Sequence, residues 1–272
     1  MKYGVMEGFQ MHHSQKKYGV WPMNSRLELF KMAKELGFHG IELGIGLDYK
    51  DDSLWTGKGT LRHSIKSEVA RTSVGVASIC LHLLNYIENS PASTIPEHRM
   101  VAHGIICNAL DAASELNASI ILVPFYGTAR LKSEEQKENL IKEMRELVTR
   151  SEDAGVCLAL ETSLEAEEAV DIIETIDSDF VQVYFDMGNA ISMGYDLIQE
   201  IETLGQYIAQ VHVKDNPNGT LGDGKIDFNQ AIKALKVIGF DEYLVLETPS
   251  LTDSTQAASY NLRYLKRVVE GD

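Results

Sequence analysis

Hydrophobic positions along the chain follow two alternating spacings. Short, nearly continuous apolar runs are followed by longer stretches in which apolar residues recur every three or four positions. A short run bounded by polar or turn residues is typical of a buried strand, and the longer spacing is typical of one face of a helix. Eight such pairs follow one another, and strands are predicted at residues 3–6, 40–43, 74–81, 119–123, 156–161, 181–186, 208–213 and 243–247.

The helices that follow these strands carry local signals at their ends. Ser25 with Glu28, and Ser133 with Gln136, have the spacing of a capping box, in which two side chains bind backbone amides of the first turn. Gly37 is placed to end the first of these helices. Further helices are predicted near residues 61–72 and 96–116, and the core-facing stripe of the latter is predicted to be Val101, Ile105, Ala109, Ala112 and Leu116.

This alternation favours a parallel sheet. Parallel strands need crossover connections, and eight strand–helix units close into a barrel of about 250 residues. The chain has 272 residues and no linker-like segment, so we predict an α/β fold with a single (β/α)8 TIM barrel domain over residues 1–272. The alternative is an open doubly wound sheet, but no GxGxxG motif or P-loop follows the first strand.

Composition limits the partners and the compartment. The formal net charge is −15, from 40 acidic and 25 basic residues, and there is no run of Lys or Arg, so nucleic-acid binding is not expected. No stretch approaches transmembrane length and the first residues lack the apolar core of a signal peptide, so no membrane association is expected. Cys80, Cys107 and Cys157 lie in apolar segments without a CxxC motif, which predicts reduced thiols in a cytoplasmic protein.

Four polar residues stand at the ends of the last four predicted strands. They are Glu161, Asp186, His212 and Glu247, at intervals of 25, 26 and 35 residues, each about one strand–helix unit long. In a parallel barrel all strands end at the same rim, where active sites are built. A salt bridge to a neighbouring Lys or Arg explains any one of these residues equally well, but four at one level favour a common site.

The chemistry of these four side chains indicates a metal site. Buried carboxylates are costly without a partner or a metal. Three carboxylates and an imidazole without thiolate suit Mn²⁺, Mg²⁺ or Co²⁺ better than a structural zinc site, which prefers Cys and His. We predict one divalent ion, with Mn²⁺, Mg²⁺ and Co²⁺ as the candidates and Zn²⁺ as a further possibility. Four protein ligands leave two positions of a six-coordinate ion for vicinal substrate oxygens, whose carbonyl the ion would polarise.

Short motifs around these positions resemble the xylose isomerase-like superfamily of sugar isomerases and epimerases. The matching segments are residues 37–43, 158–162, 185–189, 211–215, 222–228 and 246–248, in order along most of the chain. The resemblance implies a TIM barrel with one Mn²⁺ or similar ion held by Glu161, Asp186, His212 and Glu247. The nearest branches are ketose 3-epimerases, L-ribulose-5-phosphate 3-epimerases and hydroxypyruvate isomerases.

The resemblance also implies a reaction on a small sugar or sugar phosphate. Glu161 and Glu247 are the predicted catalytic pair: one removes the proton next to the substrate carbonyl, giving a metal-bound enediolate, and the other returns a proton. Return of the proton to the opposite face of the same carbon gives 3-epimerisation. Return of the proton to the adjacent carbon gives aldose–ketose isomerisation. Barrels of this type commonly self-associate, so a homo-oligomer is expected.

Several further residues near the rim are candidates for substrate contacts. Glu7 follows the first strand and His82 the third, and each has either a substrate contact or a local structural role. Glu42, penultimate in the second strand, either faces the rim or pairs with a neighbouring base. Lys214 lies two residues after His212, on the same side of the strand.

Two other candidates bear on whether the substrate is phosphorylated. Asn189, three residues after Asp186, matches the phosphopentose epimerase-like branch, whereas many free-ketose epimerases carry histidine there. Asp223 and Lys225 belong to a glycine loop at residues 222–225, which would lend backbone amides and a cation to an anionic group. A tight turn before the next helix explains this loop equally well.

Three other functions remain as alternatives. A dehydratase acting on an inositol-type ketone would use the same metal and proton-abstraction chemistry. Phosphodiesterases of the endonuclease IV type need further histidines for three zinc ions, but Asn189 and Lys225 stand where two of these are expected. A non-catalytic sugar-binding barrel would be expected to lose at least one of the four ligands, and none is lost.

Overall fold

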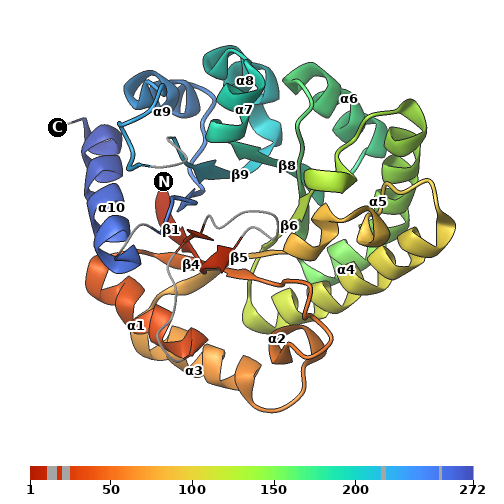
Figure 1. Ribbon diagram of the computed structural model, residues 1–272, viewed down its shortest axis with the longest axis horizontal. Coiled ribbons are helices and arrows are strands. Elements are labelled where there is room, and N and C mark those ends of the chain that lie inside the picture. The colour runs from red at the N-terminus through yellow and green to blue at the C-terminus, as the bar shows by residue number, and fades with distance from the viewer. Residues whose placement is uncertain (11–16, 20–24, 216–218, 251–252, 272) are drawn as a thin grey trace.

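Eight parallel strands close into a barrel in the computed structural model, which describes residues 1–10, 17–19, 25–215, 219–250 and 253–271 (Figure 1). Each strand pairs with the next along the chain, and β10 returns to β1 with Leu246 beside Val5. The predicted (β/α)8 fold class is therefore confirmed. The barrel strands are β1 (Lys2–Met6), β4 (Gly40–Gly44), β5 (Gly75–Cys80), β6 (Ile120–Pro124), β7 (Cys157–Glu161), β8 (Val181–Asp186), β9 (Ile208–Val213) and β10 (Tyr243–Leu246).

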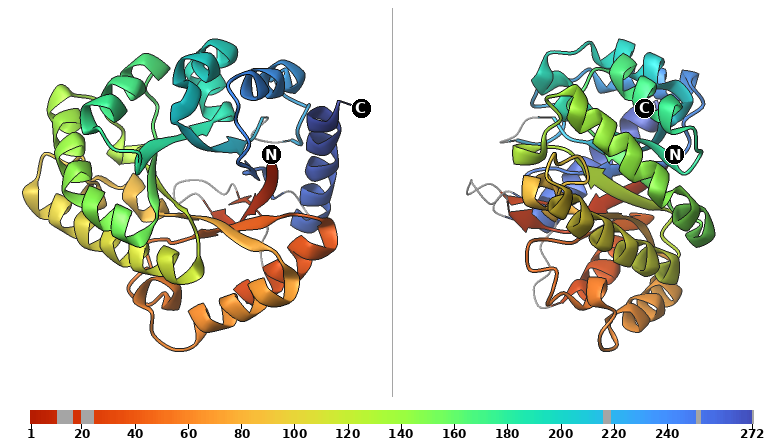
Figure 2. Two further views of the ribbon diagram at one scale, coloured as in Figure 1. Left: turned by 180° about the vertical axis from the view of Figure 1, so that it is seen from behind. Right: turned by 90° about the vertical axis from the view of Figure 1, so that its right-hand side faces the viewer.

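Helices form a ring outside the strands, as the views from behind and from the side also show (Figure 2). Short helical turns at residues 82–85, 87–89, 127–129 and 205–207 complete the connections. The helices are α1 (Arg26–Leu36), α2 (Ser53–Thr56), α3 (Leu61–Thr72), α4 (Pro96–Leu116), α5 (Glu134–Ala154), α6 (Ala166–Ile176), α7 (Met187–Met193), α8 (Leu197–Leu204), α9 (Phe228–Val237) and α10 (Ser254–Glu270).

The predicted helix ends are present, but one of the two capping boxes is not. Ser133 Oγ accepts a hydrogen bond from the Gln136 amide, and the Gln136 side chain reaches back to the amide of Lys132. At α1 the Ser25 side chain makes no capping bond, and the helix begins with the Glu28 amide bonded to the Ser25 carbonyl. The predicted capping box at Ser25 was therefore wrong, although α1 does begin where it was predicted to begin.

The buried face of α4 is also wider than the predicted stripe. Val101 is 43% exposed, whereas Ala102 and Ile106 are fully buried beside Ile105 and Ala109. The helix packs on α3 and α5 as well as on β5 and β6, so its buried face widens to include Ala102 and Ile106. Including Val101 in the stripe was therefore wrong.

A short hairpin after β1 was not predicted. Its strands are β2 (Phe9–Gln10) and β3 (Lys17–Tyr18), and the chain after β3 binds the segment that follows β10. The Gly19 amide donates to the Thr248 carbonyl at 2.9 Å, and Ser250 Oγ donates to the Gly19 carbonyl at 2.9 Å. These bonds hold the backbone next to Glu247 against the end of the hairpin.

Candidate metal centre and substrate pocket

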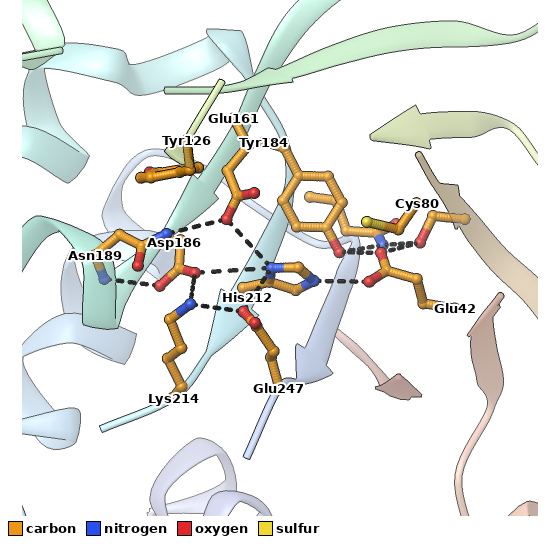
Figure 3. Close-up of polar contacts among 12 residues, drawn as sticks. Glu42, Cys80, Tyr126, Glu161, Tyr184, Asp186, Asn189, His212, Lys214 and Glu247 are labelled. Carbon is orange, nitrogen blue, oxygen red and sulfur yellow. Dashed lines mark hydrogen bonds and ion pairs between the residues drawn. The ribbon is translucent and has the colours of Figure 1, made fainter. Parts of the chain in front are cut away.

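The four predicted ligands meet at the carboxyl-terminal mouth of the barrel (Figure 3). Glu161 ends β7, Asp186 ends β8, His212 is penultimate in β9 and Glu247 directly follows β10. Only 7%, 4%, 1% and 7% of these residues, in that order, is exposed. One possible ligand atom from each lies within 4.8 Å of the others. The strand register, which pairs Asp186 with His212, keeps these side chains at one level.

The two ring nitrogens of His212 have different surroundings. Nε2 lies 2.8 Å from Glu42 Oε1, and because an ionised carboxylate only accepts, Nε2 carries the proton. Nδ1 faces three carboxylate oxygens, which lie 3.1 Å away on Glu247, 3.5 Å on Glu161 and 3.7 Å on Asp186. Within the described part of the chain, Nδ1 makes no well-aligned hydrogen bond.

This arrangement fits one divalent ion. Ligands at about 2.1 Å from an ion lie about 3 Å apart when adjacent and about 4.2 Å apart when opposite. The separations of 3.1–3.7 Å around His212 Nδ1, and the 4.8 Å limit for the whole set, are close to these values. A histidine that donates one N–H to a carboxylate and turns its other nitrogen inward is also the usual geometry of a metal-binding histidine. The residues present therefore suit a metal ion.

Lys214 supplies a positive charge beside the ligands. Its Nζ lies 2.6 Å from Asp186 Oδ2 and 2.7 Å from Glu247 Oε2. Burial lowers the pKa of Lys214, but Asp186 and Glu247 outweigh burial and raise this pKa well above its usual value. Gly188 makes room for the side chain, since a Cβ there would lie 2.4 Å from Lys214 Cγ. The charged ammonium thus partly neutralises the carboxylates.

The acidic groups of this cluster titrate differently. Burial raises the pKa of Glu161 to about 7, against the opposing effect of His212. Burial also raises the pKa of Asp186, but the Lys214 ammonium outweighs it and holds that pKa below its usual range. Asp186 is therefore ionised near pH 7, whereas Glu161 has a pKa close to that pH. Such a difference between neighbouring carboxylates is typical of sites that move protons.

Glu42 lies below the cluster, inside the barrel. It is 0% exposed, and its Oε2 accepts hydrogen bonds from Ser78 Oγ at 2.6 Å and Tyr184 Oη at 2.7 Å, while Oε1 accepts from His212. Burial raises the pKa of Glu42, but His212 and these hydrogen bonds hold it below its usual value. Of the two roles considered for Glu42, pairing with a base is the one observed. The expected substrate contact was wrong, because protein donors occupy both oxygens.

A cavity of about 300 Å³ opens above the cluster and is lined by three of the four ligands, Glu161, His212 and Glu247. Tyr126 forms one wall; its Oη donates to the Thr162 carbonyl, and its amide donates to Asn85 Oδ1 at 2.9 Å. Tyr18, Pro124 and Pro249 provide further apolar surface, and the other lining residues are Met6, Cys80, His82, Asn85, Glu161, Gly188, Asn189, Ser192, His212, Lys214, Asp215 and Glu247. A pocket with an ionic floor, apolar walls and a few polar groups suits a small polar ligand.

Three predicted contact residues line this cavity: His82, Asn189 and Lys214, whose ion pairs are described above. Asn189 Nδ2 donates to Glu161 Oε1 at 3.1 Å, and its amide donates to Asp186 Oδ1 at 2.9 Å, so Asn189 links two of the ligands. His82 Nδ1 lies 3.4 Å from Cys80 Sγ. Burial lowers the pKa of His82 to about 4, so its ring is neutral near pH 7.

Glu7 has a structural environment in place of the predicted substrate contact. Its Oε1 lies 2.6 Å from Arg26 Nε, and its Oε2 accepts from the Gly44 amide at 2.9 Å. Arg26 also binds Asp52 Oδ1 at 2.8 Å and the Gly44 carbonyl at 2.7 Å. Both oxygens of Glu7 are therefore used to fasten β1 to β4 and α2, and the predicted contact was wrong.

The glycine loop at residues 222–225 binds a carboxylate of the chain itself. Asp215 accepts hydrogen bonds from the backbone amides of Gly222, Gly224 and Lys225 at 2.9–3.1 Å. Asp223 is exposed and caps its own turn by accepting from Thr220. Asp215 thus occupies the amides that were predicted to bind an anionic substrate, whereas the substrate contacts of the Asp223 and Lys225 side chains stay predictions.

Several site residues were missed. Tyr184 and Gln210 lie two positions before Asp186 and His212, and the two-residue period of a strand places them on the same inner face. That signal was available in the sequence. Asn85, Tyr126 and Ser192 stand outside the barrel strands, where no periodic pattern marks a pocket-facing residue.

Comparison with known proteins identifies the family. The sequence pattern of the xylose isomerase-like TIM barrel family matches residues 30–268. The chain belongs to this family. Members with known activity are therefore the natural comparison for the site.

Similar family members include sugar epimerases, which are isomerases. L-ribulose-5-phosphate 3-epimerases of Salmonella paratyphi A and Escherichia coli are 26% identical over 85% of this chain and 85% of each relative. The structure of 3-keto-D-glucoside 4-epimerase from E. coli has a TM-score of 0.78 at 22% identity, covering 98% of this chain and 99% of that one. An L-ribulose 3-epimerase structure has a TM-score of 0.81 at 19% identity, covering 99% and 95%. At these identities the structural matches establish the fold alone.

Across the described ranges, no helix combines the length and the apolar character that a membrane span requires.

Proposed function

We propose that this protein is a divalent-metal-dependent epimerase or isomerase of a small sugar or sugar phosphate. The observation that carries the proposal is the position of Glu161 and Glu247 on either side of His212 at the floor of the cavity (Figure 3). Two carboxylates flanking one ion suit removal of a proton on one side of a substrate and its return on the other. The activities named for the relatives, 3-epimerisation among them, support the same chemistry.

The proposed roles follow the contacts of each residue. Glu161, Asp186, His212 and Glu247 would hold the ion, for which we propose Mn²⁺, and a bound ion would make the proton next to a substrate carbonyl more acidic. Glu161 and Glu247 exchange protons with the substrate carbon. Asn189 fixes Glu161 through its 3.1 Å hydrogen bond, and Tyr126 limits water on that side of the cavity.

Deuterium exchange tests the reaction. The protein with Mn²⁺ in D₂O is incubated with a panel of pentuloses, their 5-phosphates and hydroxypyruvate, and deuterium next to the carbonyl is measured by NMR. Exchange is expected with at least one substrate, and Glu161→Gln or Glu247→Gln should lower it about 10²–10⁴-fold. Glu143→Gln, which changes a buried glutamate on α5 bonded to His103, is the matched control.

The outcomes separate the alternatives. Full exchange in either Glu161→Gln or Glu247→Gln contradicts the two-glutamate mechanism. Loss of water from an inositol-type ketone without epimerisation would identify a dehydratase. No exchange with any substrate, with Mn²⁺ shown to be bound, would overturn the proposed function.

We also propose a cytoplasmic location and self-association. The three cysteines are free, which suits a reducing compartment. Light scattering after size exclusion tests the second proposal, and a mass of one chain, 30.3 kDa, would contradict it.

A further inference from the structure

A closed hydrogen-bond network lies inside the barrel beneath the candidate metal centre. Its members are buried, with exposed fractions of 0–1%, and they come from four strands: Glu42 on β4, Ser78 on β5, Tyr184 on β8, and Gln210 with His212 on β9. The proposed chemistry uses His212 alone among them. The function of the other four groups is therefore open.

The donors and acceptors of this network fix its direction. Gln210 Nε2 lies 2.8 Å from Ser78 Oγ and 2.9 Å from Tyr184 Oη, and an amide nitrogen only donates. Each hydroxyl has one proton, so both hydroxyls must donate to the remaining acceptor, Glu42 Oε2. That oxygen receives both protons, at 2.6 and 2.7 Å. Glu42 is thereby held as a carboxylate in one rotamer, with Oε1 aimed at His212.

We infer that Glu42 is a positioning residue that fixes the tautomer and the ring orientation of His212, so that the Nδ1 lone pair faces Glu161, Asp186 and Glu247. The inference rests on the proposed metal-dependent function. Glu42 Oε1 accepts the Nε2 proton at 2.8 Å, which leaves Nδ1 as the nitrogen available to an ion. Ser78, Tyr184 and Gln210 prevent Glu42 from turning away.

A carboxylate behind a metal-binding histidine has a known scale of effect. Loss of such a partner typically lowers metal affinity 10–100-fold, because the ring loses both its orientation and some of its basicity. Glu42→Gln keeps an acceptor oxygen and removes the charge, so we expect about a tenfold weaker Mn²⁺ affinity. Glu42→Met removes both and should approach a hundredfold loss. Tyr184→Phe, which removes one donor to Glu42, should cause a smaller loss in the same direction.

The test measures Mn²⁺ binding rather than turnover. Each full-length variant is titrated with Mn²⁺, free ion is followed by electron paramagnetic resonance, and bound ion is examined for electron spin echo modulation from a directly coordinated nitrogen. Glu115→Gln is the control, because Glu115 Oε2 pairs with Arg62 Nη1 at 3.1 Å on the outer helices, away from both groups of side chains that could hold a metal ion. We expect wild-type affinity and nitrogen modulation in Glu115→Gln, and reduced values of both in the Glu42 variants.

The outcomes test the positioning role of Glu42 and the proposed function separately. A folded Glu42→Gln whose Mn²⁺ affinity and nitrogen modulation equal those of wild type overturns the positioning role. If the Glu42 variants do not fold, Tyr184→Phe provides the test. Unchanged Mn²⁺ affinity in Tyr184→Phe would then overturn the positioning role of Glu42. Wild-type protein that binds no Mn²⁺ overturns both proposals. The expected affinity pattern without deuterium exchange on any substrate would overturn the proposed reaction and leave the role of Glu42 in place.

Discussion

Lys214, which is partly exposed, and Asp186, which is buried, form an ion pair with 2.6 Å between Nζ and Oδ2. The same ammonium lies 2.7 Å from Glu247 Oε2. Lys214 therefore neutralises the carboxylates of Asp186 and Glu247 in the metal-free protein. A divalent ion must compete with the Lys214 ammonium to bind these two carboxylates.

The first prediction follows from that competition. Lys214→Met should destabilise the metal-free protein by roughly 3–5 kcal/mol, because removing one partner leaves buried charge uncompensated. Mn²⁺ should then bind more tightly, and the gain in Tm on adding Mn²⁺ should exceed that of wild type. Thermal unfolding in EDTA and in Mn²⁺ measures both effects. Lys137→Met is the control, since Lys137 bridges Glu134 and Glu168 on the outer surface, where such pairs contribute about 1 kcal/mol or less. Equal losses in both variants would contradict the prediction.

A second prediction concerns the Asp215 loop. A Cβ at Gly224 would lie 1.9 Å from Asp215 Oδ1, so Gly224→Ala should break the hydrogen bonds from Gly222, Gly224 and Lys225. Hydrogen exchange of these amides should accelerate at least tenfold. Gly104→Ala, in the interior of α4 with no atom within 4 Å of the new Cβ, should leave them protected and stabilise the protein by about 0.5–1 kcal/mol. Unchanged protection in Gly224→Ala would show that Asp215 does not hold the loop.

The third prediction concerns the contact between the hairpin and the Glu247 segment. Gly19 has φ of +71°, and a Cβ there would lie 2.6 Å from the Met6 carbonyl oxygen. Gly19→Ala should displace the backbone bonded to Thr248 and Ser250, and the deuterium-exchange activity should fall at least tenfold. Gly59→Ala is a matched control, because Gly59 has φ of +77° but no neighbour within 4 Å of the new Cβ. If both variants lose activity equally, backbone strain alone explains the effect.

The fourth prediction is a pH dependence far from the site. His39 Nδ1 accepts a hydrogen bond from the Tyr3 amide at 2.9 Å, which requires a neutral ring nitrogen. Burial, with a smaller contribution from Lys266, lowers the pKa of His39. As the pH falls below about 6.5, the unfolded chain binds a proton at this residue before the folded protein does, so this contribution to stability is lost.

Urea unfolding between pH 5 and 8 in EDTA measures this effect. His39→Gln keeps an acceptor for Tyr3 without titrating in this range. The free energy of unfolding of wild type should therefore fall more steeply below pH 6.5 than that of His39→Gln. Parallel curves would contradict the assignment.

The barrel strands and the four converging side chains followed from sequence because both depend on local patterns. Apolar runs of fixed spacing predict parallel strands, and polar residues at strand ends predict a common rim. These two patterns were enough to place four residues in one group: Glu161, Asp186, His212 and Glu247.

The remaining contacts depend on pairings between distant segments. Glu42 meets His212 across 170 positions of the chain, and only the closed barrel brings them together. The amides of residues 222–225 suggested an anion site, but a carboxylate several residues earlier binds them. The hairpin strands β2 and β3 have two residues each, which is too short for a periodic signal.

The network beneath His212 joins the two halves of the barrel. Glu42 and Ser78 belong to the first half of the chain, whereas all four proposed ligands belong to the second. The later strands thus carry every atom that would touch the ion, but not the carboxylate that turns His212 toward it. Full Mn²⁺ affinity therefore requires that both halves of the barrel have come together. Mn²⁺ affinity can thus be used to follow barrel closure during folding.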